Sequence, residues 1–160
     1  MDTTALLVST PIASFRVPHA REYFETLPCP PPSTVYGMLL SMVGEEQRLT
    51  HAGAQVALAL LSQPHTSTVL RTMWRVKEKK TPLGIRPNAR PDFQELLSPV
   101  DLLVFVQQGD DPNAPPLCAR VANALQNPAG VSRHGALSLG ESTHIVNDIL
   151  PWTGQTPGAP

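Results

Sequence analysis

The segment PCPPPSTVYGMLLSMVG, residues 28–44, decides the fold of this chain. Its three consecutive prolines predict a non-helical run, because proline has no N–H and favours extended backbone. Ser33 or Thr34 then predicts the N-cap of a helix, and Gly44 predicts its end. Between them, apolar side chains recur at spacings of three and four residues, which is typical of one buried helix face: Val35, Met38, Leu39 and Met42.

Strands are predicted on both sides of this helix. Thr3–Ser9 is apolar and ends before Pro11, and a long proline-bearing loop is predicted over 13–32. Beyond the helix, 56–61 and 69–77 predict a hairpin with a turn at 63–66, followed by a loop over 78–92. The remaining predicted elements are strands at 93–97 and 102–107, a helix at 115–126, and a short strand or glycine-bearing loop at 135–140.

This order of elements predicts the α+β class. Strand, helix, two strands with an inserted hairpin, helix and strand form the ferredoxin-like plan, in which two helices cover one face of an antiparallel sheet. RNA-recognition modules use the same architecture and leave the other face open. We expect one RNA-recognition-like domain over residues 1–150, with a basic insertion at about 77–92, and a disordered tail over 151–160.

The composition narrows the class of protein further. Eighteen prolines among 160 residues exclude an all-helical bundle, and 41% apolar with 16% charged residues predicts a chain that folds. The longest apolar run, 56–61, is too short to span a membrane, and 5–8 is too short for a secretory signal, which favours a cytoplasmic protein. Cys29 and Cys118 match no metal or redox spacing, so we expect free thiols.

Positive charge is concentrated in one window. Between residues 71 and 90 seven basic side chains stand against Glu78 alone, a net charge of +6, whereas the whole chain has a net charge of -1. Basic residues along an extended segment can neutralise the phosphates of a nucleic acid. A solvated hairpin tip is the alternative interpretation. The basic residues are Arg71, Arg75, Lys77, Lys79, Lys80, Arg86 and Arg90.

Aromatic residues near these cations in the sequence could either be buried in the protein or stack on RNA bases. In 69–77 the odd positions form a basic face and the even positions an apolar one, on which Trp74 is predicted as a buried residue of the hairpin. Phe15 with Arg16, His19 and Arg21 combines a stacking ring with cations, as single-stranded RNA binding requires. Phe15 in the core, beside solvated cations, is the alternative.

The sequence contains no pattern that defines a catalytic centre. A tyrosine, a lysine and a histidine could together form a metal-independent ribonuclease site, although no spacing requires it: the candidates are His19, Tyr23, Tyr36, Lys77 and Lys80. The five histidines form no metal-ligand pair, and no phosphate-binding glycine loop or nucleophile elbow occurs. We expect no metal and no cofactor.

Three motifs resemble one family of CRISPR-associated proteins. Pro11-Ile-Ala-Ser-Phe-Arg16, Pro28-Cys-Pro-Pro-Pro-Ser-Thr-Val-Tyr-Gly37 and Leu137-Ser-Leu-Gly-Glu-Ser142 resemble the subunit that caps the crRNA 5′ handle in type I Cascade complexes, a member of the repeat-associated mysterious protein superfamily. Glu141 stands where a basic residue is common in that family. The short chain also fits compact subtypes, including those recruited by transposons.

The resemblance implies a non-catalytic subunit that binds the crRNA 5′ handle, contacts the backbone and large subunits of Cascade, and helps to read the protospacer-adjacent motif in target DNA. A metal-independent endoribonuclease that processes pre-crRNA is the alternative, and a protein-interaction module without RNA contact is a third class. The implied RNA-binding residues are Phe15, Arg16, His19, Arg21, Arg75, Lys77, Lys79, Lys80, Gly140 and Ser142. The implied contacts to the target DNA are Arg86, Asn88 and Arg90.

Overall fold

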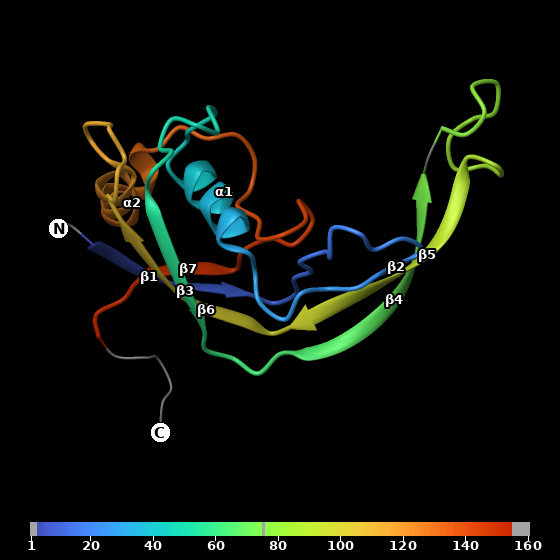
Figure 1. The fold of residues 1–160 in the computed structure, drawn as a ribbon, viewed down its shortest axis with the longest axis horizontal. Helices are drawn as coiled ribbons and strands as arrows, with labels where there is room; N and C mark the ends of the chain where they lie inside the picture. Colours follow the sequence, from blue (N-terminus) through green and yellow to red (C-terminus); the bar gives the residue numbers. More distant parts are fainter. Residues whose placement is uncertain (1–2, 75, 155–160) are drawn as a thin grey trace.

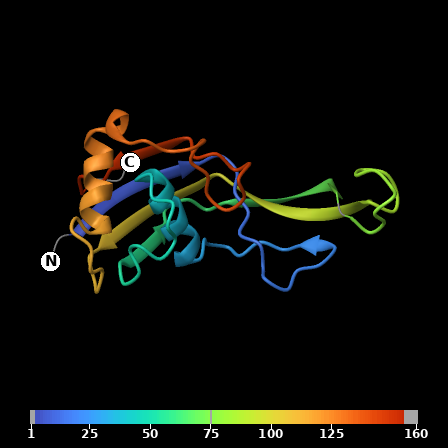
Figure 2. The same cartoon turned by 90° about the horizontal axis from the view of Figure 1, so that it is seen from above.

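The computed structural model describes residues 3–74 and 76–154. They form a body with two helices and a long arm that projects from it (Figure 1). The body contains a four-stranded antiparallel sheet with the strand order β3-β6-β1-β7. Both helices lie on the same face of this sheet (Figure 2). The strands and helices of the body are β1 (Thr3–Thr10), α1 (Pro32–Met42), β3 (Gln55–Leu60), β6 (Val100–Gln107), α2 (Leu117–Gln126) and β7 (Asp148–Pro151).

The strand order is that of a ferredoxin-like fold, because the first strand of the plan lies between the third and the fourth. Alternate residues of each strand point toward the helices, as the pleat requires. In β1 and β6 these residues are fully or almost fully buried, and they pack against α1 and α2. The core that results contains Leu6, Val8, Val35, Leu39, Leu102, Val104, Val106, Leu117 and Val121.

The arm is a second sheet of three strands, β2 (Tyr23–Phe24), β5 (Ala89–Ser98) and β4 (His65–Trp74), in the order β2-β5-β4. β4 and β5 pair antiparallel from His65 opposite Ser98 to Trp74 opposite Ala89. Only Pro99 separates β5 from β6, so the arm continues directly into the body sheet. We call the connection between β4 and β5, residues 76–88, the arm tip.

The predicted hairpin of 56–61 with 69–77 is wrong. β3 pairs with β6, and β4 pairs with β5 in the other sheet. The apolar side chains of β3 complete the face that the helices cover, so its partner is the central strand β6 rather than its neighbour in sequence. Residues 61–64 carry the chain from one sheet to the other, and residues 65 and 66 of the predicted turn already belong to β4.

The loop predicted over 78–92 ends earlier, because β5 begins at Ala89 and contains Pro91. The N–H of Phe93 donates to Glu22 O at 3.0 Å, on the side of β5 away from β4. The nitrogen of Pro91, two residues away, faces the same side, beyond the end of β2. Proline is compatible with this strand because no hydrogen bond is required there.

The C-terminal end of α1 agrees with the prediction, whereas its N-cap does not. The N-cap is Pro31 rather than Ser33 or Thr34, and no side chain caps the helix. Proline suits this start, since its missing N–H would have no partner in the first turn. Gly44, with φ of +69°, follows the helix as predicted, and a Cβ there would lie 2.1 Å from Ser132 O.

The C-terminal part of the chain also departs from the prediction. Of the two predictions for 135–140, a short strand or a glycine-bearing loop, the loop is observed, whereas the last strand of the sheet is β7, which was not predicted. The predicted tail begins too early, because Pro151 belongs to β7 and the N–H of Trp152 donates to Ala5 O at 3.0 Å. The Trp152 ring meets Phe105 edge-on, with centroids 5.6 Å apart. Residues 155–160 lie outside the described part of the chain.

A tight turn at residues 138–145 joins the body to the arm. It is closed by a bridge between Ser138 and Ile145 and by a 3.0 Å hydrogen bond from Leu139 N to His144 O. Glu141 Oε2 accepts a 2.9 Å hydrogen bond from Arg71 Nη1 of β4, and its Oε1 accepts one of 2.9 Å from Gln94 Nε2 of β5. Gln94 is 1% exposed, so the Glu141 carboxylate satisfies a buried donor.

The same turn holds the segment that follows β1. A Cβ on Gly140, whose φ is +90°, would lie 2.5 Å from Ser14 O, so only glycine fits this contact. The N–H of Ser14 donates to His144 Nδ1 at 3.2 Å. Burial lowers the pKa of His144, against the opposing effect of the Glu141 carboxylate, which favours the neutral ring that can accept this bond.

A buried polar cluster connects the two helices at the opposite end of the body. His51 Nδ1 lies 2.7 Å from Asp111 Oδ2, and Asp111 also accepts the N–H of Leu117 at the start of α2. Arg120 of α2 bonds His51 Nε2 at 2.8 Å and Glu45 at 2.7 Å. Burial raises the pKa of Asp111, but hydrogen bonds from Leu117, Asn113 and His51 outweigh it and lower the pKa from 3.8 to about 2.

Within the described ranges, no helix is long and apolar enough to cross a membrane.

We expect Asp111→Asn to lower the free energy of unfolding by about 2–4 kcal/mol, because an amide cannot accept all the hydrogen bonds that this buried carboxylate accepts. The depressed pKa also makes part of the stability depend on pH. That part, about 2 kcal/mol, is present above about pH 4 and is lost as the pH falls toward 2. Urea unfolding between pH 7 and 2.5 measures both effects, with Asp110→Asn, an exposed neighbour, as the control. An Asp111→Asn variant that keeps the acid-dependent loss would contradict this assignment.

We expect Glu141→Ala to lower stability by about 1–3 kcal/mol, because it leaves the buried Gln94 amide without this acceptor and Arg71 without its ion pair. A double-mutant cycle with Arg71→Ala should give a coupling energy of about 0.5–1.5 kcal/mol. Glu46→Ala is the control, since Glu46 is exposed and its neighbour His134 is exposed too. Additive effects of the two variants would show that Glu141 does not bind Arg71 in solution.

Candidate nucleic-acid interface

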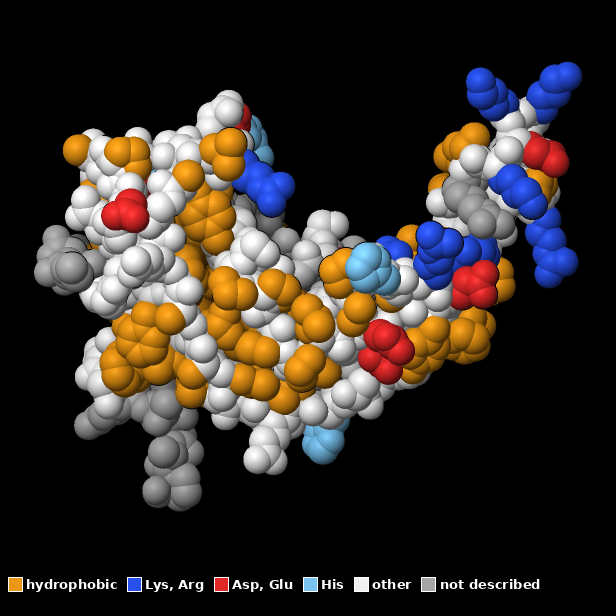
Figure 3. Space-filling view, in the orientation of Figure 1, with side chains coloured by type: hydrophobic (Ala, Val, Ile, Leu, Met, Phe, Trp, Pro, Cys, Tyr) orange, Lys and Arg blue, Asp and Glu red, His pale blue; other side chains and the backbone are white. Residues whose placement is uncertain are grey.

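The surface is hollowed between the helices of the body and the arm tip, and Lys and Arg side chains gather at the tip (Figure 3). Further cations line the inner side of the arm (Figure 3). The hollow therefore has positive charge at its far end, at the arm tip. Such a distribution suits a polyanion that runs along the arm.

The arm tip presents its cations to solvent. Four basic side chains of the tip are exposed, as residues that bind phosphates must be: Lys77, Lys79, Lys80 and Arg86. In the described part of the chain none of the four takes part in an ion pair. Glu78 is the one acidic residue among the described residues of the tip, and its carboxylate accepts a hydrogen bond from Thr81 Oγ1 at 3.0 Å. Arg75 lies outside the described residues.

Asn88 was predicted to contact DNA, and the structure contradicts this. It is 0% exposed, and its side chain holds the tip together. Asn88 Oδ1 accepts the N–H groups of Lys77 and Glu78 at 2.7 and 2.9 Å, and its Nδ2 donates to the carbonyls of Glu78 and Thr81. An asparagine among Gly and Pro residues is an ordinary signal for such loop bonding.

Arg90, at the base of the tip, is held by ion pairs with two carboxylates. Its Nε lies 2.6 Å from Asp92 Oδ1, and Nη1 lies 3.9 Å from Glu22 Oε1. Asp92 is 2% exposed, so its carboxylate depends on Arg90 for compensation of its charge. Of the three residues predicted to contact target DNA, Arg86 is exposed, Arg90 is partly buried and Asn88 is buried.

The residues predicted around Phe15 divide into a buried ring and exposed cations. Phe15 is 3% exposed and belongs to the hydrophobic core, so the prediction that it stacks on an RNA base is wrong. Arg16 lies over the ring of Phe24, 3.9 Å from the centroid, and its Nη2 donates to Ala20 O. His19 and Arg21 are exposed, and they precede Glu22, whose carbonyl accepts the N–H of Phe93 in β5.

The glycine-bearing motif contributes structure and one exposed hydroxyl. Gly140 packs against the backbone at Ser14, as described above, whereas Ser142 is exposed. Glu141 binds Arg71 and Gln94 of the arm. The turn that carries this motif therefore fixes the arm, and its acidic residue is occupied by protein contacts.

The two tyrosines of the candidate ribonuclease site lie on different parts of the molecule. Tyr23 in β2 donates from its hydroxyl to Glu95 Oε1 at 3.0 Å on the arm, whereas Tyr36 in α1 donates to Arg48 O in the body. Figure 1 shows β2 and α1 well separated. The structure thus does not gather all the candidate residues at one place. Among the described residues no group of three His, Cys, Asp or Glu is placed to hold a metal ion.

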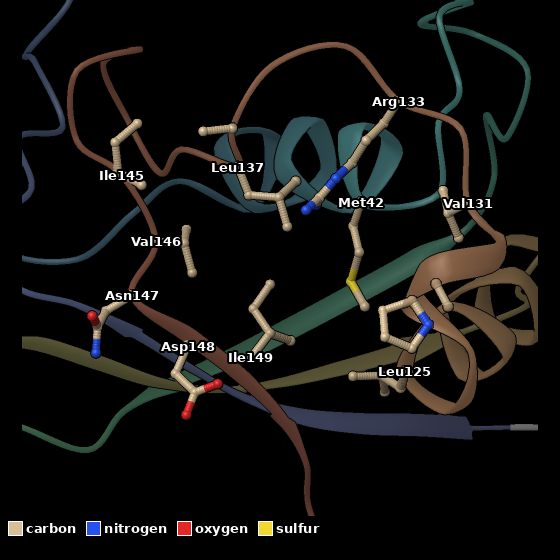
Figure 4. A pocket seen from close by; sticks show the side chains of 13 residues that line it. Met42, Leu125, Val131, Arg133, Leu137, Ile145, Val146, Asn147, Asp148 and Ile149 are labelled. Atoms are coloured by element: carbon tan, nitrogen blue, oxygen red, sulfur yellow. The ribbon is translucent and has the colours of Figure 1, made fainter.

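A cavity of about 340 Å³ lies in the body, between the end of α2 and the segment before β7 (Figure 4). Its lining is mainly aliphatic, with Met42, Leu137 and Ile149 facing inward and Arg133 reaching into it (Figure 4). Such a lining offers no base paired with a nucleophile. It therefore gives no support to a catalytic centre in the body.

Sequence reasoning missed the exposed aromatic residues of the arm. Trp74, predicted to be buried, is 67% exposed, and Phe93 and Tyr23 are 50% and 41% exposed. The alternation predicted over 69–77 is confirmed for 69–74, since Leu70 and Trp74 share one face and Arg71 and Met73 the other. β4 ends at Trp74, so Val76 and Lys77 belong to the arm tip instead. Leu70 and Trp74 on the apolar face are largely exposed.

Comparison with known proteins yields a family and several similar folds. The family model described as CRISPR-associated protein (Cas_Cas5) matches residues 3–142. A relative from Myxococcus xanthus (strain DK1622), named CRISPR-associated protein Cas5, is 46% identical over 150 residues, which cover 92% of this chain and 70% of the relative.

Solved structures show the same fold at low sequence identity. A chain of a CRISPR RNA-guided surveillance complex superposes with a TM-score of 0.66 at 15% identity, over 94% of this chain and 62% of that one. A structure described as a Cas protein gives a TM-score of 0.56 at 18% identity, over 99% of this chain and 67% of that one. This chain thus spans somewhat less than two thirds of the first solved chain.

The predicted α+β fold and the predicted family are therefore both confirmed. The family model extends over most of the sequence, and the relative from Myxococcus xanthus is similar along nearly the whole chain. The protein belongs to the Cas5 family of CRISPR-associated proteins.

Proposed function

We propose that this chain is a non-catalytic subunit of a type I CRISPR Cascade effector, and that it binds the 5′ handle of crRNA in the cytoplasm. Membership of the Cas5 family supports a role in a CRISPR system. The observation that carries the RNA-binding part is the set of four exposed cations at the end of an arm that curves over a hollow surface.

Electrostatics supports a nucleic acid as the partner of this surface. The window 71–90 has a net charge of +6, although the whole chain has a net charge of -1. Lysines on a projecting arm keep their positive charge away from the acidic side chains of the body, so their attraction for phosphates is not cancelled. His19 and Arg21 are also exposed, in the segment that leads into β2 of the arm.

Contacts to other molecules follow from the same arrangement. We place the RNA handle along the inner side of the arm, with Lys77, Lys79 and Lys80 on its phosphates. Arg86 is the residue that we assign to the DNA near the protospacer-adjacent motif, because it is exposed and its guanidinium suits a guanine edge. The backbone and large subunits of Cascade would then flank the arm and the body.

The first experiment combines binding and cleavage on one gel. We expect the purified chain to retard labelled repeat RNA without metal and to leave it intact. Cleavage within the repeat would replace this proposal with the pre-crRNA endoribonuclease. Retardation of unrelated RNA with equal affinity would show that the chain does not bind the 5′ handle specifically and would contradict that part of the proposal.

We expect Lys79→Glu with Lys80→Glu to weaken binding of repeat RNA by roughly 10- to 100-fold at moderate salt, because two phosphate contacts become repulsive. The slope of log K against log salt should fall by about 1.4, the value for two contacts on a single strand. The matched control is Arg48→Glu with Arg133→Glu, which makes the same change in net charge at exposed positions of the body. Equal losses in both variants would indicate a general charge effect, without a specific arm contact.

A further inference from the structure

Trp74 has an unusual environment at the end of β4. Its side chain is 67% exposed, although the indole is the largest apolar group in the arm. One part of the ring packs against Gly84 in the arm tip, where a Cβ would lie 3.1 Å from both Cε2 and Nε1. Gly84 has φ of +80°, which also favours glycine. The indole is thus supported from the tip and open to solvent elsewhere.

The loop that supports the indole is held in place by hydrogen bonds. Asn88 is buried and connects the backbone of Lys77, Glu78 and Thr81 by four hydrogen bonds. These bonds restrict the loop that carries Gly84, so the ring of Trp74 rests on an ordered surface. A rigid aromatic residue loses little conformational entropy when a second flat group packs on it.

The arm tip that supports this exposed ring also carries several cations. The described residues of the tip carry Lys77, Lys79, Lys80 and Arg86, against the single carboxylate of Glu78. A flat aromatic surface among cations is the combination that binds single-stranded nucleic acid, because bases stack on the ring while phosphates meet the charges.

We propose that Trp74 stacks on an unpaired base of a single-stranded nucleic acid whose phosphates are bound by the cations of the arm tip. The proposal rests on the proposed function, which it extends from charge recognition to recognition of a base. It assigns to this chain a stacking residue other than Phe15, which is buried. The same chemistry is present in a guide RNA and in a displaced DNA strand.

Nucleic acid fits the tip better than a protein partner does. Val76, Leu83 and Ile85 are also exposed there, and they could contact an apolar protein surface. However, the centres of protein interfaces are depleted of lysine, whereas three of the four tip cations are lysines. Apolar side chains beside unstacked bases are also common in nucleic-acid complexes.

The chain offers a direct spectroscopic test. It contains two tryptophans, so Trp152→Phe leaves Trp74 as the sole indole in the full chain. We expect titration with single-stranded repeat RNA to quench the emission of this variant, because a stacked base quenches an indole. RNA with an abasic site at successive positions should lose the quenching at one position. Single-stranded DNA of the same sequence and an RNA duplex distinguish the two possible sources of the base.

Affinity gives a second, independent readout. Trp74→Ala should weaken binding of single-stranded RNA by about 5- to 100-fold, the range for loss of one stacked base. Trp74→Phe should recover most of this affinity, because a phenyl ring still stacks. The matched control is Leu70→Ala, which removes a side chain of similar exposure, 64%, from the same face of β4. Circular dichroism confirms that each variant is folded.

The outcomes separate this proposal from the proposed function. RNA binding that persists with unchanged Trp74 emission, and with full affinity in Trp74→Ala, would overturn the stacking proposal and leave the handle-binding proposal intact. Loss of Cascade assembly in Trp74→Ala with unchanged RNA affinity would make the tip a protein-docking surface and would overturn it too. Absence of any RNA binding by the unaltered chain would overturn both.

Discussion

The carboxylate of Glu141 is the contact on which the arrangement of this molecule depends. It accepts hydrogen bonds from Arg71 in β4 and Gln94 in β5, and its turn also holds the segment after β1 through Gly140 and His144. Three parts of the chain that are distant in sequence therefore meet at one turn. The buried side-chain amide of Gln94 donates to this carboxylate. If the arm moved away from the turn, this amide would become exposed to solvent or would lose its hydrogen-bond acceptor.

This joint adds to the contacts of Leu97 in β5, which pairs with Ala13 and belongs to the hydrophobic core. β5 continues into β6 after Pro99, which fixes where the arm starts, and pairing with β4 keeps it extended. At the far end, the buried Asn88 side chain orders the tip. The cations therefore lie at the end of an arm that is held in place at both its base and its tip. Such a rigid support suits the binding of an extended ligand.

Local patterns predicted the elements well and their partners less well. The helix within 28–44 and the alternation in 69–77 depend on residues close in sequence, and both are observed, the alternation as far as the end of β4 at Trp74. The pairing of β3 with β6 depends on which apolar face the helices cover, which no local pattern contains. Phe15 and Trp74 have opposite environments from those proposed for them as RNA-binding and buried residues. Burial of each ring depends on which distant segments pack against it: Phe15 lies in the hydrophobic core, whereas Trp74 packs on Gly84 and is 67% exposed.

The identity of residue 141 links the fold to the location of the charge. The family resemblance implies a basic residue in this motif, where a cation could bind phosphate. A glutamate there cannot bind phosphate, but it can neutralise Arg71 and fix the arm. The unpaired positive charge is then concentrated at the tip, in Lys77, Lys79, Lys80 and Arg86. In this chain, therefore, the turn positions the arm, and the arm tip carries the exposed cations that we propose as the nucleic-acid contact.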